Sequence, residues 1–277
     1  MAKSILFYFT GTGNSLAVAK SITKELTDVF LVPVLREDAL SYIDKYTESI
    51  GLVFPIHMNA VPNVVVKFIE KIKLLSSVYF YAVATHGGVP GMSGLHLNKV
   101  LKKHNISLDG YFEIKMINNT PKGVAPKFLM NLCWELDITP EKINTIISES
   151  HLSIENIIEK IKSKEKTTLQ CLPSGRKRVA YWMMNLIWYI SEKSKYKLKF
   201  ILDDCCTGCG TCEKICTTKR IRMNGNKPEW VHDNCSFCYA CFNYCPTQAI
   251  GVEHYTKKLG RYHHPYISAD DIAGQTK

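Results

Sequence analysis

Two cysteine runs with the same spacing constrain this chain more than any other feature of its 277 residues. The first run has the form C-x2-C-x2-C-x3-C and consists of Cys206, Cys209, Cys212 and Cys216. The second repeats that spacing with Cys235, Cys238, Cys241 and Cys245, and Pro246 follows it. This spacing is typical of loops that bind two [4Fe–4S] cubes, because three thiolates of each run bind one cube and the fourth reaches the other.

The runs resemble those of bacterial two-cluster ferredoxins, and the resemblance implies the ligand sets. The first cysteine set is Cys206, Cys209, Cys212 and Cys245. The second cysteine set is Cys235, Cys238, Cys241 and Cys216. Structural zinc sites usually combine two C-x2-4-C pairs, and disulfides are disfavoured in a reducing compartment. Iron–sulfur clusters therefore fit this spacing better than either alternative.

Four residues depart from the ferredoxin pattern or lie outside it. Cys205 directly precedes the first run at the wrong spacing, so we expect a spare thiol. Cys133 and Cys171 have no partner at ligand spacing and are expected to be core or inert thiols. Thr217 follows the first run where ferredoxins usually have proline, which predicts preserved ligation but a changed cluster potential.

A glycine- and hydroxyl-rich loop follows an apolar run, Ser4–Phe9, and precedes a helical pattern from Leu16 to Leu26. The loop consists of Thr10, Gly11, Thr12, Gly13, Asn14 and Ser15. Backbone N–H groups at a helix N-terminus, together with hydroxyl groups, form an anion site. The loop has no lysine and matches neither the P-loop nor the G-x-G-x-x-G pattern. An alternative is a polar turn before an N-capped helix.

This loop is similar to the flavodoxin phosphate loop, [ST]-x-T-G-x-[ST], at every defined position. The resemblance implies that the loop binds the phosphate of FMN. The surrounding pattern agrees, because strands alternate with helices along the chain. Further strands are expected at Phe30–Leu35, Ser49–Pro55, Val78–Thr85 and Tyr111–Ile117. We predict an α/β fold with a flavodoxin-like, doubly wound parallel sheet whose ligand crevice lies at the carboxyl ends of the strands.

Two further loops, residues 55–61 and 85–91, follow strands of this sheet. By resemblance to flavodoxin they would lie on either side of the isoalloxazine ring. One side would be formed by Pro55, His57, Met58 and Asn59, and the other by Thr85, His86, Gly87 and Gly88. Many flavodoxins place Trp or Tyr against the ring, whereas these loops offer two histidines. The two glycines would allow the backbone to approach the flat ring closely.

The formal net charge of +10 is concentrated in one segment. Residues 162–199 carry ten basic and two acidic side chains around an apolar stretch, residues 179–190. A helix that is apolar on nearly all faces favours packing between domains, and contact with an anionic membrane surface is the alternative. The lysines could also attract an acidic redox partner. The chain has no zinc-finger, RNP or helix-turn-helix signature, so nucleic acid is not an expected partner.

The chain therefore divides into four parts. We expect a flavodoxin-like FMN-binding domain at 1–165, a basic linker and apolar connector helix at 166–200, a small α+β ferredoxin domain at 201–252 and a C-terminal tail at 253–277. No apolar run reaches transmembrane length, and the N-terminus lacks the features of a signal peptide. Thiols at ligand spacing in such a chain indicate the cytoplasm.

This combination resembles the EFR1-type flavodoxin–ferredoxin fusion proteins of anaerobes over nearly the whole chain. The resemblance implies two [4Fe–4S] clusters and FMN, with redox proteins as partners. We expect an electron-transfer protein that couples one-electron and two-electron partners. An FMN-dependent reductase of a small substrate, fed through the ferredoxin domain, is the second hypothesis, and a redox sensor or scaffold is the third. No nucleophile–base arrangement is present, and the oligomeric state stays open.

Overall fold

The computed structural model describes residues 3–57, 60–88, 90–121, 138–169, 182, 186, 199–252 and 261–277. Its N-terminal half contains a five-stranded sheet with the order β2-β1-β3-β4-β5, and every neighbouring pair is parallel. The strands are β1 (Lys3–Tyr8), β2 (Val29–Pro33), β3 (Thr47–Pro55), β4 (Tyr79–His86) and β5 (Gly110–Lys115). This order is the flavodoxin-like one, so the predicted doubly wound sheet is confirmed.

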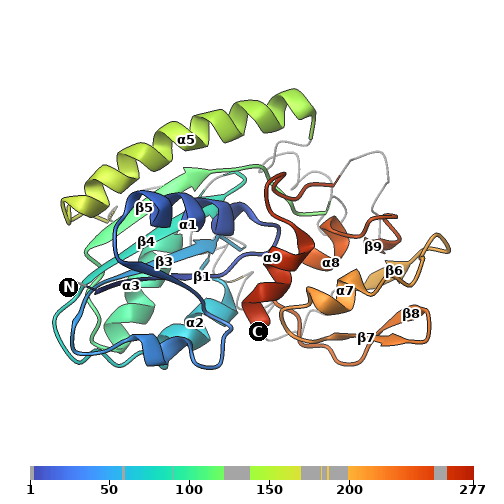
Figure 1. The fold of residues 1–277 in the computed structure, drawn as a ribbon, viewed down its shortest axis with the longest axis horizontal. Coiled ribbons are helices and arrows are strands. Elements are labelled where there is room, and N and C mark those ends of the chain that lie inside the picture. The colour runs from blue at the N-terminus through green and yellow to red at the C-terminus, as the bar shows by residue number, and fades with distance from the viewer. Residues whose placement is uncertain are drawn as a thin grey trace.

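Helices cover both faces of the sheet, which explains why its central strands are apolar on both sides. They are α1 (Asn14–Glu25), α2 (Asn63–Ile69), α3 (Ser93–Lys103) and α5 (Pro140–Lys162), with a short 3-10 helix, η1, at Ala39–Tyr42. Figure 1 shows α1 and α5 on one face and α2 and α3 on the other. The side chains of Phe7, Phe54 and Phe80 are fully buried between these layers.

The cysteine runs lie in a second, smaller unit made of short elements. Its strands are β6 (Phe200–Leu202), β7 (Ile221–Asn224), β8 (Lys227–Trp230) and β9 (Ile250–Val252). Strands β6 and β9 pair antiparallel, and β7 and β8 form a hairpin whose turn includes Gly225 at φ 56°. Two single-turn helices, α7 (Thr211–Lys214) and α8 (Ala240–Asn243), each begin inside a cysteine run.

The C-terminal segment, residues 261–277, packs between the two units. It contains α9 (Ala269–Ala273) and a 3-10 helix, η3 (Gly274–Thr276). Ser268 and Asp271 form a capping box that fixes the start of α9. Figure 1 shows α9 lying between the sheet and the elements that carry the cysteines. The segment that the sequence separates as a tail therefore joins the two folded units.

Most of the predicted connector helix lies outside the described residues, as do Met58, Asn59, Cys133 and Cys171. Two connector positions are described as helical, Trp182 and Leu186, and both side chains are exposed. Within the part of the chain that is described, no helix is long and apolar enough to cross a membrane.

Candidate redox site

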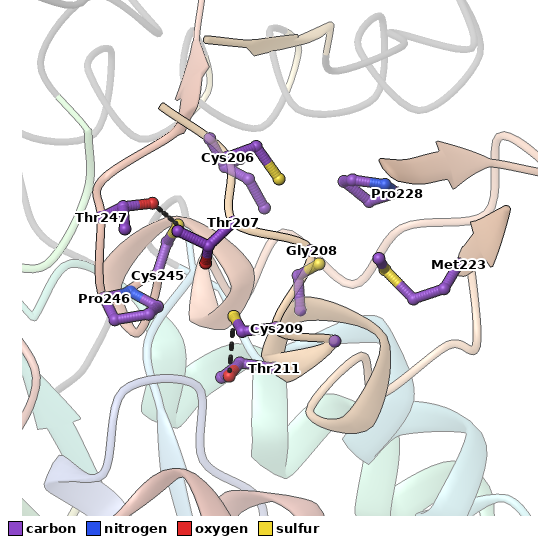
Figure 2. A pocket seen from close by; sticks show the side chains of 13 residues that line it. Cys206, Thr207, Gly208, Cys209, Thr211, Met223, Pro228, Cys245, Pro246 and Thr247 are labelled. Carbon is purple, nitrogen blue, oxygen red and sulfur yellow. Dashed lines mark hydrogen bonds between the residues drawn. The ribbon is translucent and has the colours of Figure 1, made fainter. Parts of the chain in front are cut away.

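The first cysteine set comes together around one pocket, although its members belong to both runs. Figure 2 shows the loop from Cys206 to Cys212 on one side of this pocket and the segment from Cys245 to Thr247 on another. Met223 and Pro228, from the β7–β8 hairpin, complete the lining. The presence of Cys245 is the observation that matters, because a pocket built from one run alone would have Cys216 in its place.

The second cysteine set also combines members of both runs, as the neighbours that affect the pKa of Cys241 indicate. Burial raises the pKa of Cys241 well above its ordinary value, and neighbouring thiolates raise it further. Those neighbours include the other three members of the set, Cys216, Cys235 and Cys238, and also Cys212 of the first set. The two sets therefore lie beside each other, and the last cysteine of the first run lies near the second run.

Backbone N–H groups point at several of these sulfurs. Arg220 N donates to Cys216 Sγ and Ala249 N donates to Cys245 Sγ, each at 3.2 Å. Hydrogen bonds to ligand sulfurs are among the contacts that tune a bound iron–sulfur cluster. The two bonds occupy equivalent places, four residues after the last cysteine of each run, so the two loops share one local design.

Burial works against ionisation where no metal is bound. It raises the pKa of Cys212 to about 11 and also raises the pKa of Cys238. Such thiols bind protons at neutral pH, and a metal ion must displace them. Within the described ranges, no three His, Cys, Asp or Glu side chains are close enough to bind one ion. A four-iron cube takes one thiolate per iron, so its ligands do not converge on a single point.

Cys205 differs from its neighbours in its surroundings. Its side chain is exposed, and its Sγ donates to the carbonyl of Thr247 at 3.3 Å. The prediction that this thiol is a spare stays a prediction.

Thr217, which replaces the usual proline, makes contacts that proline could not make. Its Oγ1 lies 2.6 Å from Ser236 Oγ and 3.7 Å from Cys238 Sγ. If Ser236 donates to Thr217, the Thr217 hydroxyl donates to the sulfur. The departure from the ferredoxin pattern therefore adds a hydrogen bond to the second cysteine set.

Replacing Thr217 by valine should lower the reduction potential of one cluster. A hydrogen bond to a ligand sulfur stabilises the more negative, reduced state. A bond worth about 0.5–1.5 kcal/mol corresponds to roughly 20–60 mV for a one-electron couple. Potentiometric EPR measures both clusters in one titration, so the unshifted cluster is an internal control. Equal shifts in both clusters, or none, would contradict the assignment of this hydrogen bond.

The phosphate loop, residues 10–15, lies between β1 and α1, as predicted. Gly13 has φ 99°, in the left-handed region that favours glycine, and its N–H donates to Thr10 Oγ1 at 3.1 Å. The loop is almost fully buried. Ser15 Oγ lies 2.8 Å from Thr85 Oγ1, and Asn119 donates to Thr12 Oγ1. The hydroxyl groups of Thr12 and Ser15 thus have side-chain partners, and that of Thr10 accepts from the backbone of Gly13.

The backbone of this loop still offers donors. Among the residues that the structure describes, no acceptor contacts the N–H groups of Thr12, Asn14 and Ser15. Buried N–H groups without acceptors are rare in proteins, and here they lie at the start of a helix of twelve residues. The loop therefore fits an anion such as a phosphate group, without any basic side chain.

The two predicted ring loops extend from the carboxyl ends of β3 and β4, where they were expected. Ile56 N donates to Thr85 O at 2.8 Å, and His86 Nδ1 lies 2.6 Å from Gly88 O. Pro55 ends β3, and His57 forms an isolated bridge with Ala60. The structure thus brings the described residues of both loops to one edge of the sheet, beside the phosphate loop.

Gly87 contacts the backbone of a neighbouring loop. A Cβ at this position would lie 2.4 Å from Cα of Asn118, which follows β5. This contact requires the absence of a side chain here, and the expected approach to a flat ring stays a prediction. A pattern confined to residues 85–91 could not reveal this contact.

His57 connects the ring loop to the second cysteine set. The backbone of Ser236, which lies between Cys235 and Cys238, is close enough to the His57 side chain to affect its pKa. Burial lowers the pKa of His57 to about 4, so the ring is neutral at pH 7. Phe9 packs against it edge-on, with 6.2 Å between ring centroids.

Gly11 brings the phosphate loop into direct contact with the same cysteine loop. A Cβ at Gly11 would lie 2.4 Å from the carbonyl oxygen of Cys238. Gly11 occupies the undefined second position of the flavodoxin pattern, so a glycine there was the one available signal. Tyr262, His264 and Gln275 also contact this loop. No pattern in the sequence indicated these contacts.

The sheet order and the cysteine loops define the class: a flavodoxin-like α/β fold with a small C-terminal ferredoxin-type segment. A family model for a 4Fe-4S dicluster domain matches residues 198–246. No curated protein matches the chain.

Solved structures resemble part of this chain. A flavoprotein from Lactobacillus acidophilus in complex with FMN is 13% identical (TM-score 0.33), covering 41% of this chain and 93% of that one. Rubredoxin oxygen:oxidoreductase from Desulfovibrio gigas is 16% identical (TM-score 0.39), covering 59% of this chain but only 37% of that one. An archaeal flavodoxin is 16% identical (TM-score 0.32), covering 58% of this chain and 99% of that one. Identities at this level concern the fold alone.

Proposed function

We propose that this protein transfers electrons, with two [4Fe–4S] clusters and one FMN forming a single relay, as in the flavodoxin–ferredoxin fusion proteins it resembles. The observation that carries the proposal is the contact between Gly11 and the backbone of Cys238. It sets the loop that fits a phosphate directly against a predicted cluster ligand. Cubes exchange single electrons and FMN takes one or two, so the pair would couple partners of both kinds.

The residues support an order within the relay. The second cysteine set lies beside the phosphate loop and, through Ser236, beside His57. The first set lies farther out, and Cys209 in it is exposed. A redox protein would therefore exchange electrons at the first cluster, and the second cluster would connect it to the flavin. The protein's contribution is to position the three groups, since no acid–base step is needed.

The direct test is anaerobic purification followed by iron, sulfide and flavin assays and potentiometric EPR. About eight irons and one FMN per chain are expected. Zinc in place of iron, or no flavin after reconstitution, would contradict the proposal. Steady turnover of a small acceptor without exchange with redox proteins would favour the reductase hypothesis instead.

Bulky substitutions in the phosphate loop should remove flavin and leave the clusters. Thr12 and Ser15 are fully buried, so Thr12→Leu and Ser15→Leu would fill the anion site and break its geometry. Loss of one hydrogen bond to a charged group alone weakens binding about 10- to 100-fold. Flavin fluorescence titration measures the loss, and iron content should stay unchanged.

Thr145→Leu is the matched control, because Thr145 is exposed on α5 and bonds only within its own helix. Loss of iron in the Thr12 or Ser15 variants, with flavin retained, would contradict the division of cofactors between the two units.

A further inference from the structure

The C-terminal segment binds the backbone of the phosphate loop at its first residue. Gln275 is fully buried and exchanges two hydrogen bonds with Thr10. Thr10 N donates to Gln275 Oε1 at 2.9 Å, and Gln275 Nε2 donates to Thr10 O at 3.1 Å. This paired contact fixes the backbone where β1 ends and the loop begins.

Two further contacts fall on alternate residues of the loop. His264 N donates to Thr12 O at 2.8 Å. The hydroxyl of Tyr262 donates to Asn14 Oδ1 at 2.8 Å, and Asn14 Nδ2 in turn donates to Ile117 O at 3.1 Å. Thr10, Thr12 and Asn14 are thus each bound by the same short segment.

The segment also packs on the left-handed glycine of the loop. A Cβ on Gly13 would lie 2.8 Å from Cβ of Ile267 and 3.0 Å from Cβ of His264. At the other end, Tyr262 N donates to Asn243 Oδ1 at 3.0 Å, and Asn243 lies on α8 of the cysteine unit. Ion pairs flank the segment, with Lys20 bound to Asp271 at 2.7 Å, but exposed pairs contribute little.

None of these bonds uses the N–H groups that fit an anion. Gln275 and His264 bind the N–H of Thr10 and the carbonyls of Thr10 and Thr12, and Tyr262 binds a side chain. The N–H groups of Thr12, Asn14 and Ser15 keep no acceptor among the described residues. If the segment only held the two units together, its bonds could equally well have occupied the N–H groups of Thr12, Asn14 and Ser15.

We infer that Tyr262 and Gln275 belong to the FMN site as positioning residues that preorganise the phosphate loop. The inference rests on the proposed binding of FMN at this loop. Ordering a loop on binding costs free energy, and a loop ordered in advance binds more tightly. The effect should be specific to the phosphate, because the Tyr262 hydroxyl and the Gln275 amide bind residues of the phosphate loop.

The test compares FMN with riboflavin, which lacks the phosphate. Tyr262→Phe deletes one hydroxyl and keeps the buried ring, and Gln275→Leu deletes both bonds to Thr10. Dissociation constants are measured by flavin fluorescence on cluster-loaded protein from which flavin has been removed. Each variant should bind FMN about tenfold more weakly, which corresponds to about one good hydrogen bond, and riboflavin unchanged. Tyr266→Phe is the control, since Tyr266 is 77% exposed in the same segment.

Three results for the variants would overturn the inference. They are unchanged FMN binding in both variants, tighter FMN binding, and equal losses for FMN and riboflavin, which would indicate a general loss of structure. Iron content reports folding of the cysteine unit, and if Tyr262→Phe loses iron, Gln275→Leu decides alone. Wild-type protein that binds neither flavin would overturn the proposed function, and this inference with it. Wild-type binding with insensitive variants would overturn the inference alone.

Discussion

Replacing Gly11 by alanine is expected to force the phosphate loop away from the loop that carries Cys238. The new Cβ would lie 2.4 Å from the Cys238 carbonyl oxygen and 3.1 Å from its carbonyl carbon. Both neighbours are backbone, so neither can rotate aside. Overpacking of this kind costs about 1–3 kcal/mol of stability. The variant should unfold at lower temperature, bind FMN more weakly and slow electron exchange between the second cluster and the flavin.

Gly274→Ala is the matched control for this variant. Gly274 has φ −59°, in the helical region, and a Cβ there would meet nothing within 4 Å. It should leave flavin binding, iron content and melting temperature close to wild type. Stopped-flow reduction of the flavin through the clusters provides the rate. A wild-type rate in Gly11→Ala would show that the contact at Gly11 does not carry the exchange.

Cys216→Ala and Cys241→Ala are expected to remove the same cluster, although the two cysteines belong to different runs. Each should leave about four of eight irons per chain and abolish the same EPR signal. Cys245→Ala and Cys212→Ala should abolish the other signal. The reason is the exchange seen in the structure, where Cys245 lines the pocket of the first run.

Flavin should no longer be reduced through the clusters when the second one is missing, since the backbone of Cys238, in the second cysteine set, lies against Gly11. Cys205→Ala is the control, because Cys205 contacts Thr247 rather than lining the pocket with the first set. It should keep all its iron. If Cys216→Ala instead abolished the signal that Cys212→Ala abolishes, each run would bind its own cluster and the exchange would be wrong.

Short sequence patterns were sufficient to predict features that form within one short segment of the chain. The apolar run Ser4–Phe9 forms β1, and the loop after it leads into the buried N-terminus of α1. Thr139 caps α5, with Pro140 at its first position. A strand, a tight turn and a helix start are all decided within a dozen residues. The family match to residues 198–246 supports the cysteine runs for the same reason, because their spacing is itself the constraint.

The structural roles of other residues depend on contacts with other segments of the chain. Gly87 is required by Asn118, and Thr217 bonds to Ser236 and approaches Cys238 Sγ. Both contacts depend on how loops from different elements pack, and neither leaves a periodic or spaced pattern. The sequence pattern of residues 85–91 gave no sign of the contact between Gly87 and Asn118.

The sequence by itself determined the parallel sheet, the loop of residues 10–15 between β1 and α1, and the two cysteine runs, because spacing and periodicity along the chain encode each of them. Only the tertiary structure decided how they meet. It places Cys238 on Gly11, His57 on Ser236 and Gln275 on Thr10, across separations of up to 265 residues. Such contacts arise when whole units pack against each other, and the free energy of that packing belongs to no single segment.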